Sequence, residues 1–370
     1  MGPFSRLSVE LLLLILVAAQ ATAHPGGTNS HRGVAHYSRF FVFGDSFTDT
    51  GNSDICPLTA GGISSRPPYG QTYFDRPSGR YSDGRIITDF LVEELNVPQP
   101  LPYLAGKTAA DFVNGVNYAI SGATALERAF LESLGVPAFI PISLRNETSW
   151  LENVVRQLGS SHEQGKIMEN SVFFVGQIGE NDYFFALLSD QTVEQTARLV
   201  PHVVGAIRSA ITVRARTVVV MGMAPLGCAP YVLSLFPGLP VDYDPVSGCN
   251  MRLNRLAQLH NRALMGMLLE LQLAHDDRFL IYADVYHTVA NLVTSPVKYG
   301  FGATPLAACC GSGGGPYNFN FTAFCGDPGY TMLGDPSKYI YWDGIHFTEP
   351  ANRLIAGCVL RGKLKRPPGY

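Results

Sequence analysis

The sequence contains few charged residues. Only 15% of its 370 residues are charged, and the net charge at pH 7 is −3. Since no basic stretch is interleaved with aromatic residues, we expect no nucleic-acid partner. The hydrophobic fraction of 46% is typical of a chain that buries a core, and it excludes an intrinsically disordered protein.

Long hydrophobic runs are also scarce, and the one clear run lies near the N-terminus. Residues 11–19 are apolar, Arg6 precedes them, and the small residues 21–23 follow. Because this run is shorter than the roughly 20 residues that span a bilayer, a secretory signal peptide over residues 1–23 is favoured over a membrane anchor. We therefore expect a mature chain, residues 24–370, without a transmembrane segment, secreted to the extracellular space or the cell wall.

The seven cysteines include no Cys-x-x-Cys pair and no Cys/His cluster with zinc-ligand spacing. We therefore expect disulfides and no metal site, as is usual for cysteines in a secreted chain. Cys228 with Cys249 would close one loop, and either Cys309 or Cys310 with Cys325 would close another. The odd number leaves at least one thiol unpaired within the chain.

Two tripeptides match the acceptor pattern for N-glycosylation, and they begin at Asn146 and Asn320. In a secreted chain both asparagines are candidate glycosylation sites. The same tripeptide also arises by chance, so the pattern alone leaves the occupancy of both sites open.

Apolar strand-like runs alternate with helical periodicity along the chain. Strands, some continuing into polar turns, are expected within 39–45, 114–123, 171–182, 217–223 and 279–284. Apolar residues at helical spacing predict helices near 83–96, 149–158, 192–213, 250–275 and 349–362. This alternation predicts a parallel sheet covered by helices on both faces.

Three further features shape the predicted organisation. Ser149 and Glu152 form a capping box that is expected to start the second helix, and Pro201 is expected to bend the third. Residues 296–340 are glycine-rich and aperiodic, which indicates a long loop used for substrate binding or stapled by disulfides. Since no internal repeat or compositional break occurs, we expect one domain over residues 24–370.

A serine directly follows the first predicted strand. Ser46 stands after Gly44 and Asp45, where an aromatic run ends. Open α/β sheets bind ligands at the carboxyl ends of their strands. A serine there can act as a nucleophile if a base and oxyanion donors accompany it. The alternative interpretation is a turn residue or a helix cap.

A candidate base and its orienting carboxylate lie three residues apart near the C-terminus, at Asp343 and His346. On a turn or a helix start this spacing places both side chains on one side. The carboxylate can then hold one imidazole nitrogen while the other faces Ser46. The alternative is a surface aspartate beside a histidine that is satisfied near a helix cap.

Candidate donors for an oxyanion lie at three strand ends. They are the backbone N–H groups of Ser46 and Gly122 and the side-chain amide of Asn181. Glycine permits close approach of a ligand to the backbone, and an amide side chain supplies two N–H donors. Gly122 and Asn181 can also be simple turn residues.

Four segments stand out in order along the chain: Phe43–Asn52, Asn117–Ala123, Gly179–Asp182 and Asp343–Phe347. Together they resemble the conserved blocks of the GDSL or SGNH hydrolases, and in detail those of the secreted plant GDSL esterase/lipases. Phe47 stands where the family name has leucine, which replaces one apolar residue by another. The Gly-x-Ser-x-Gly elbow of the α/β-hydrolases is absent, which disfavours that rival serine-hydrolase fold.

The resemblance implies a flavodoxin-like three-layer α/β sandwich, a parallel sheet with helices on both faces, and no metal or organic cofactor. In agreement with the residue-based interpretation, it implies that Ser46 is the nucleophile, His346 the base and Asp343 the orienting carboxylate. It also implies that Ser46, Gly122 and Asn181 form the oxyanion hole.

These expectations lead to a carboxylic ester hydrolase that forms an acyl-enzyme. The resemblance implies small-molecule or polymer ester substrates, among them choline esters of phenolic acids, acetylated cell-wall polysaccharides and lipids. An acyltransferase with the same serine chemistry and an alcohol acceptor is the alternative. A non-catalytic binding module is disfavoured because no catalytic position is replaced. Four aromatic residues of the long loop after the first strand either line the site or pack the loop: Tyr69, Tyr73, Phe74 and Tyr81.

Overall fold

Six strands form a parallel sheet in the part of the chain that the computed structural model describes, residues 37–212 and 215–361. They are β1 (Arg39–Phe43), β2 (Leu101–Pro102), β3 (Gly115–Asn117), β4 (Ser171–Val175), β5 (Thr217–Met221) and β6 (Phe279–Ala283). Their order across the sheet is β2-β3-β1-β4-β5-β6. The predicted signal peptide, residues 1–23, lies outside the described residues.

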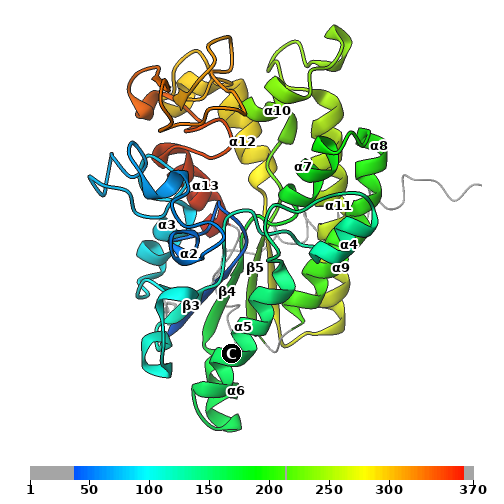
Figure 1. Cartoon of the computed structure of the whole chain (residues 1–370). Helices are drawn as coiled ribbons and strands as arrows, with labels where there is room; N and C mark the ends of the chain where they lie inside the picture. Colours follow the sequence, from blue (N-terminus) through cyan, green and yellow to red (C-terminus); the bar gives the residue numbers. More distant parts are fainter. Residues whose placement is uncertain (1–36, 213–214, 362–370) are drawn as a thin grey trace, which may run out of the picture. The chain divides into compact units, whose positions relative to one another are not determined.

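The strand order identifies the class of the fold. When the two-residue edge strand β2 is set aside, the order is that of flavodoxin-like sheets. In such a sheet the first strand lies inside the sheet, with the next strand of the chain on one side and the later strands on the other. Helices α3 (Ile87–Leu95), α12 (Val285–Thr294) and α13 (Glu349–Arg361) lie on one face, and α5 (Leu144–Gln157), α9 (Val200–Ile211) and α11 (Met251–Ala274) lie on the other (Figure 1). The expected three-layer α/β fold is thereby confirmed.

Shorter elements decorate this core. The remaining α-helices and strands described are α2 (Asn52–Ile55), α4 (Arg128–Ser133), α6 (Ser161–Glu169), α7 (Glu180–Leu188), α8 (Val193–Thr196), α10 (Pro230–Leu235), β7 (Cys310–Gly311) and β8 (Thr331–Met332). Short 3-10 helices lie at Ile63–Ser65, Tyr103–Ala105, Ala109–Phe112, Ala197–Leu199, Leu226–Cys228, Pro240–Asp242, Pro296–Tyr299 and Pro336–Lys338. In the described part of the chain, no helix combines the length and apolar character that crossing a membrane requires.

The centre of the sheet is an aromatic core built by β1 and β4. Phe40, Phe41 and Phe43 are exposed by 3% or less. Successive residues of a strand point to opposite faces, so Phe41 stacks on Phe173 at 4.8 Å between ring centroids while Phe40 stacks on Phe174 at 6.1 Å. A strand that is apolar on both faces is stable only because helices cover both faces.

The capping box predicted at Ser149 is wrong, because α5 begins five residues earlier, at Leu144. The N–H of Ser143 donates to Oδ1 of Asn146 at 2.9 Å, and this pair caps the helix start. Ser149 lies inside the helix, where its hydroxyl donates to the carbonyl of Arg145 at 2.9 Å. The helix therefore uses an asparagine in its first turn where the sequence pattern pointed to a glutamate.

The long helix predicted over 192–213, bent at Pro201, is also wrong as a single element. Two α-helices, α8 and α9, occupy this segment and are joined by a 3-10 turn at Ala197–Leu199. Pro201 lies in the first turn of α9. Proline is tolerated there because the N–H that it lacks has no partner within the helix.

Two disulfides cross-link the described part of the chain. Cys228 pairs with Cys249, as predicted, and Cys325 pairs with Cys310. The sequence left the choice between Cys309 and Cys310 open. Cys309 stays a buried thiol, and the surrounding apolar groups raise its pKa to about 12.

This pairing predicts different outcomes for two neighbouring substitutions. Cys310→Ala should remove the cross-link and lower the free energy of unfolding by about 3 kcal/mol, the entropic value for a loop of this length. Cys309→Ala should keep the cross-link and lose only one buried sulfur, which costs on the order of 1 kcal/mol. Peptide mapping without reduction and urea unfolding measure both quantities. A cross-link that survives Cys310→Ala contradicts the pairing.

Candidate active site

Three turns meet at the carboxyl edge of the sheet because β1 lies between β3 and β4. Val42 of β1 is aligned with Asn117 of β3, and β1 also pairs with β4 along its whole length. The turns after β1 and β3 carry Ser46 and Gly122, and Asn181 lies in the first turn of α7, which follows β4. This is the switch point at which α/β sheets bind ligands, since the chain crosses to opposite sides of β1 here.

Ser46, His346 and Asp343 form a continuous hydrogen-bonded chain. Oγ of Ser46 lies 2.7 Å from Nε2 of His346, and Nδ1 of His346 lies 2.7 Å from Oδ2 of Asp343. The three residues are exposed by only 7%, 4% and 3%. With a proton on Nδ1 facing the carboxylate, Nε2 is the nitrogen that can accept the serine proton.

The Asp343 turn orients both carboxylate oxygens. Oδ1 accepts the N–H groups of Ile345 and His346 at 3.0 and 2.8 Å, while Oδ2 faces the imidazole. Burial by itself raises the pKa of Asp343. The charge of His346 and the hydrogen bonds from His346 and Tyr69 outweigh burial, so that this pKa lies below its ordinary value. The carboxylate therefore stays ionised next to the imidazole.

Two aromatic rings flank the imidazole of His346. The ring of Phe47 lies 5.2 Å from it and the ring of Tyr81 lies 4.9 Å from it, between centroids. Tyr81 is buried, and so is Tyr69, whereas Tyr73 is half-exposed. Phe47, the position at which the sequence departs from the family name, therefore helps to hold the imidazole in place.

Two of the oxyanion candidates, Gly122 and Asn181, meet at one backbone segment. Gly122 has a φ of 82°, a conformation that favours glycine, and Nδ2 of Asn181 donates to the carbonyl of Ala123 at 2.9 Å. No described residue accepts a hydrogen bond from the N–H of Ser46 or of Gly122. These donors are thus available to a ligand.

A buried polar network ties the serine turn to the Gly122 turn. Oδ2 of Asp49 accepts the N–H of Ser121 at 3.0 Å, and Oδ1 of Asp49 accepts that of Asn52 at 2.7 Å. The side chain of Asn117 donates to the carbonyl of Thr48 at 2.7 Å. The sequence analysis missed these residues as site components, although Asp49, Asn52 and Asn117 all belong to segments that it singled out.

Residues 40–359 match the protein family described as GDSL-like Lipase/Acylhydrolase. The chain belongs to this family. Two Arabidopsis thaliana proteins, GDSL esterase/lipase At1g28590 and GDSL esterase/lipase At2g27360, are each 41% identical to it, over 98% and 90% of this chain and 90% and 86% of their own. GDSL esterase/lipase At1g28580 of the same plant is 37% identical, over 99% of this chain and 95% of its own. The protein is accordingly a serine esterase/lipase that acts on ester bonds.

A second Asp-x-x-His pair in this GDSL enzyme shows what the local motif contributes by itself. Asp284 and His287 follow β6, and Nδ1 of His287 lies 2.7 Å from Oδ2 of Asp284. Their side chains are 44% and 76% exposed, against 2% and 5% for Asp343 and His346. No described serine forms a hydrogen bond with His287. The Asp-x-x-His motif is therefore sufficient to form the histidine–carboxylate hydrogen bond. Only the pair that is buried next to Ser46 can act as a catalytic base and its orienting carboxylate.

Two buried carboxyl groups, Glu180 and Asp182, form hydrogen bonds within the segments near the candidate active site. Glu180 accepts the hydroxyl of Tyr231 at 2.7 Å, and Asp182 accepts the N–H groups of Ala125 and Leu126 at 2.8 and 2.9 Å. Burial raises the pKa of Glu180 and of Asp182 to about 7 in each case. Among the described residues, no group of three or more acidic, histidine or cysteine side chains is placed to hold a metal ion.

The raised pKa of Glu180 predicts that this residue stabilises the fold more in acid than in weak base. Between the ordinary value of 4.5 and about 7, the folded state keeps a proton that the unfolded state has released. The contribution of Glu180 to the free energy of unfolding should therefore fall with rising pH in this window, by at most about 1.4 kcal/mol per pH unit. Above pH 7 its contribution is fully lost.

Urea unfolding at pH 5 and pH 8 tests this dependence. Glu180→Gln should narrow the difference in stability between the two pH values, because the amide does not titrate. The matched control is Glu152→Gln on the exposed side of α5, which should leave the difference unchanged. The same difference between the two pH values in Glu180→Gln and in the wild type would refute the prediction.

Proposed function

We propose that this protein is a secreted carboxylic ester hydrolase that works through an acyl-enzyme on Ser46. Oγ of Ser46 attacks the ester carbonyl carbon while Nε2 of His346 accepts the hydroxyl proton. The tetrahedral intermediate then collapses, the ester C–O bond breaks, and His346 returns the proton to the leaving alcohol. A water molecule repeats these steps on the acyl-enzyme, releases the carboxylic acid and regenerates Ser46.

The hydrogen-bonded chain from Asp343 through His346 to Ser46 is the observation that carries this proposal. A serine hydroxyl is a weak nucleophile unless a base lies within hydrogen-bond reach, and here the Oγ–Nε2 distance is 2.7 Å. Asp343 keeps the imidazole in the required tautomer and stabilises the imidazolium that forms during attack.

We assign the oxyanion to three donors: the N–H groups of Ser46 and Gly122 and the side-chain amide of Asn181. Asn181 uses one amide proton on the carbonyl of Ala123, and the amide carries a second proton. Donors that are fixed before the reaction begins stabilise the developing charge without reorganisation. The buried network around Asp49 supports this arrangement, because it anchors Ser121 beside Gly122.

The substrates that we propose are esters of lipids, of phenolic acids or of acetylated polysaccharides. Water is the proposed acceptor, and an acyltransferase remains the alternative. The two differ in product: with an added alcohol, an acyltransferase accumulates a new ester, whereas a hydrolase accumulates the free acid.

We also propose secretion, with removal of residues 1–23, a single domain over residues 24–370, and glycans on Asn146 and Asn320. The two disulfides support an oxidising compartment. Asn146 is exposed in the first turn of α5, and Asn320 is half-buried in the loop between the cysteines of the second disulfide.

Replacement of the proposed nucleophile tests the reaction. Ser46→Ala should lower kcat for p-nitrophenyl esters by roughly 10⁴-fold or more and should abolish labelling by a serine-directed organophosphate. Ser209→Ala on the exposed side of α9 is the matched control and should behave like the wild type. Unchanged turnover in Ser46→Ala would disprove the proposal, and activity on short or long acyl chains separates esterase from lipase preference.

The oxyanion assignment has a separate test. Asn181→Ala should lower kcat by about 100- to 1000-fold with little change in KM, since the amide acts on charge that develops only in the transition state. Asn153→Ala, on the exposed side of α5, is the control. A change confined to KM would assign Asn181 to ground-state binding instead.

A further inference from the structure

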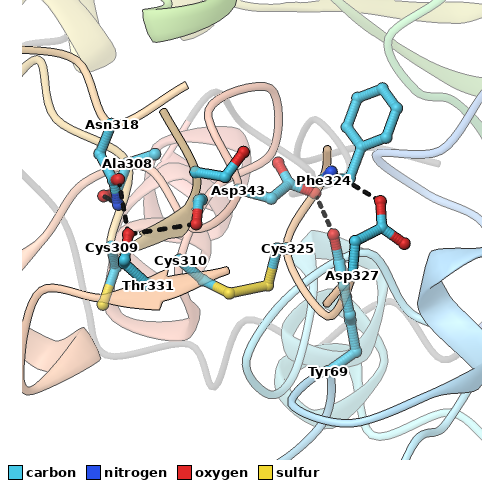
Figure 2. The surroundings of a disulfide bond; sticks show 12 residues. Tyr69, Ala308, Cys309, Cys310, Asn318, Phe324, Cys325, Asp327, Thr331 and Asp343 are labelled. Carbon is cyan, nitrogen blue, oxygen red and sulfur yellow. Dashed lines mark hydrogen bonds between the residues drawn. A yellow bond between two sulfur atoms is a disulfide. The ribbon is translucent and has the colours of Figure 1, made fainter. Parts of the chain in front are cut away.

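Asp343 has a second hydrogen-bond donor besides His346. The hydroxyl of Tyr69 donates to Oδ2 of Asp343 at 2.7 Å, across 274 positions of sequence. This is the same oxygen that faces Nδ1 of His346. Tyr69 is exposed by 1% and Asp343 by 3%, so the contact is shielded from water. Figure 2 shows Tyr69 and Asp343 beside the Cys310–Cys325 disulfide.

The ring of Tyr69 is held by a compact cluster behind the catalytic turn. Its buried members are Tyr69, Cys309, Cys310, Cys325 and Trp342. Tyr69 meets Trp342 edge to face at 5.7 Å between ring centroids. The N–H of Cys310 donates to the carbonyl of Trp342 at 2.7 Å, so the disulfide and the residue preceding Asp343 are joined directly.

The loop that carries Tyr69 is fastened to the same disulfide. Arg66 forms an ion pair with Asp327 at 2.7 Å, two residues beyond Cys325. Gly326 packs so closely that a Cβ there would lie 2.8 Å from the carbonyl oxygen of Pro67. The loop before Tyr69 is thus attached to the segment that follows Cys325, while the ring of Tyr69 packs on Trp342. Both contacts restrict the ring, so the hydroxyl stays close to Asp343.

The hydroxyl of Tyr69 is a neutral donor to the carboxylate that orients His346. Burial, and then the charge of Asp343, raise the pKa of Tyr69 well above its ordinary value, so the phenol stays a neutral donor. Tyr118 is equally buried, yet its hydroxyl has no hydrogen-bond partner among the described residues. The packing of a tyrosine ring in this core thus does not by itself require a bonded hydroxyl.

We propose that Tyr69 is a positioning residue for the ester hydrolysis, which extends the chain Ser46–His346–Asp343 by one member. It donates to the carboxylate and keeps Oδ2 aimed at Nδ1 of His346. It also keeps Asp343 ionised where burial would otherwise favour the neutral acid. The proposal rests on the proposed function, since a positioning role requires that His346 act as the base.

The acidic limb of the pH profile reports this role. Without the phenol, the ionised form of Asp343 loses a hydrogen bond, so Asp343 takes up a proton at higher pH. As long as Asp343 is ionised, its carboxylate also stabilises the imidazolium of His346 more strongly. Both changes move the acidic limb to higher pH. Other ionisable groups that act on these residues are Arg66 and Tyr81 near Tyr69, and Glu180 near His346. All of them are retained when only the Tyr69 hydroxyl is removed.

The experiment compares Tyr69→Phe with Tyr118→Phe in the full chain. Tyr69→Phe keeps the ring contact with Trp342 and should lower kcat about tenfold, the factor expected for one hydrogen bond to a charged group. KM should stay unchanged and the acidic limb should move to higher pH. Tyr118→Phe should keep the wild-type profile. In an Asp343→Asn background, Tyr69→Phe should cause no further loss.

Proton NMR supplies a readout that does not depend on turnover. The downfield signal of the His346 Nδ1–H should move in Tyr69→Phe and stay in place in Tyr118→Phe. A wild-type kcat and pH profile in Tyr69→Phe would overturn the proposal, and so would an equal loss at every pH that persists in the Asp343→Asn background. If the wild type hydrolyses no ester while the signal still moves, the proposed function fails and the Tyr69 contact stands.

Discussion

The site depends on the position of β1 between two parallel neighbours. Because β3 and β4 both pair with β1, the turns that follow the three strands must emerge at the same edge of the sheet. The segments that carry Ser46, Gly122 and Asn181 are far apart in sequence, and each follows one of these three neighbouring strands. The ring of Phe41 in β1 packs on the ring of Phe173 in β4 and helps to hold these two strands together. The packing of the core therefore also fixes the edge of the sheet at which the site lies.

Buried polar side chains fix the conformations of the turns at this edge of the sheet. Asp49, Asn117 and Asp182 each bond to the backbone of a neighbouring turn, and buried polar groups are tolerated only when they are bonded in this way. The cost is visible in the buried acids: Asp182 and Glu180 have raised pKa values. The edge that orders the catalytic groups is therefore also sensitive to pH.

The two Asp-x-x-His pairs separate local from tertiary causes. One pair directly follows β6 and the other lies in a turn, yet both place Nδ1 of the histidine 2.7 Å from the carboxylate. Only the pair at Asp343 is buried, faces Ser46 and receives the hydroxyl of Tyr69. Short-range spacing thus produces the histidine–carboxylate bond at two places, while the neighbouring loops select the one that can act on a serine.

The sequence by itself determined the α/β class, the places of the main strands along the chain and the four motif segments, because apolar periodicity and motif spacing are local properties. It offered Cys228–Cys249 as a candidate pair, and the structure contains this disulfide. The sequence misplaced the start of α5, because alternative capping residues look alike in the local sequence pattern. It also joined α8 to α9, because a proline in the first turn of a helix, such as Pro201, has the same local pattern as a proline that bends a helix. Only the tertiary structure decided that Cys325 pairs with Cys310 and that Tyr69 reaches Asp343. Such contacts depend on where distant loops pack against the sheet edge, and no spacing along the chain encodes them.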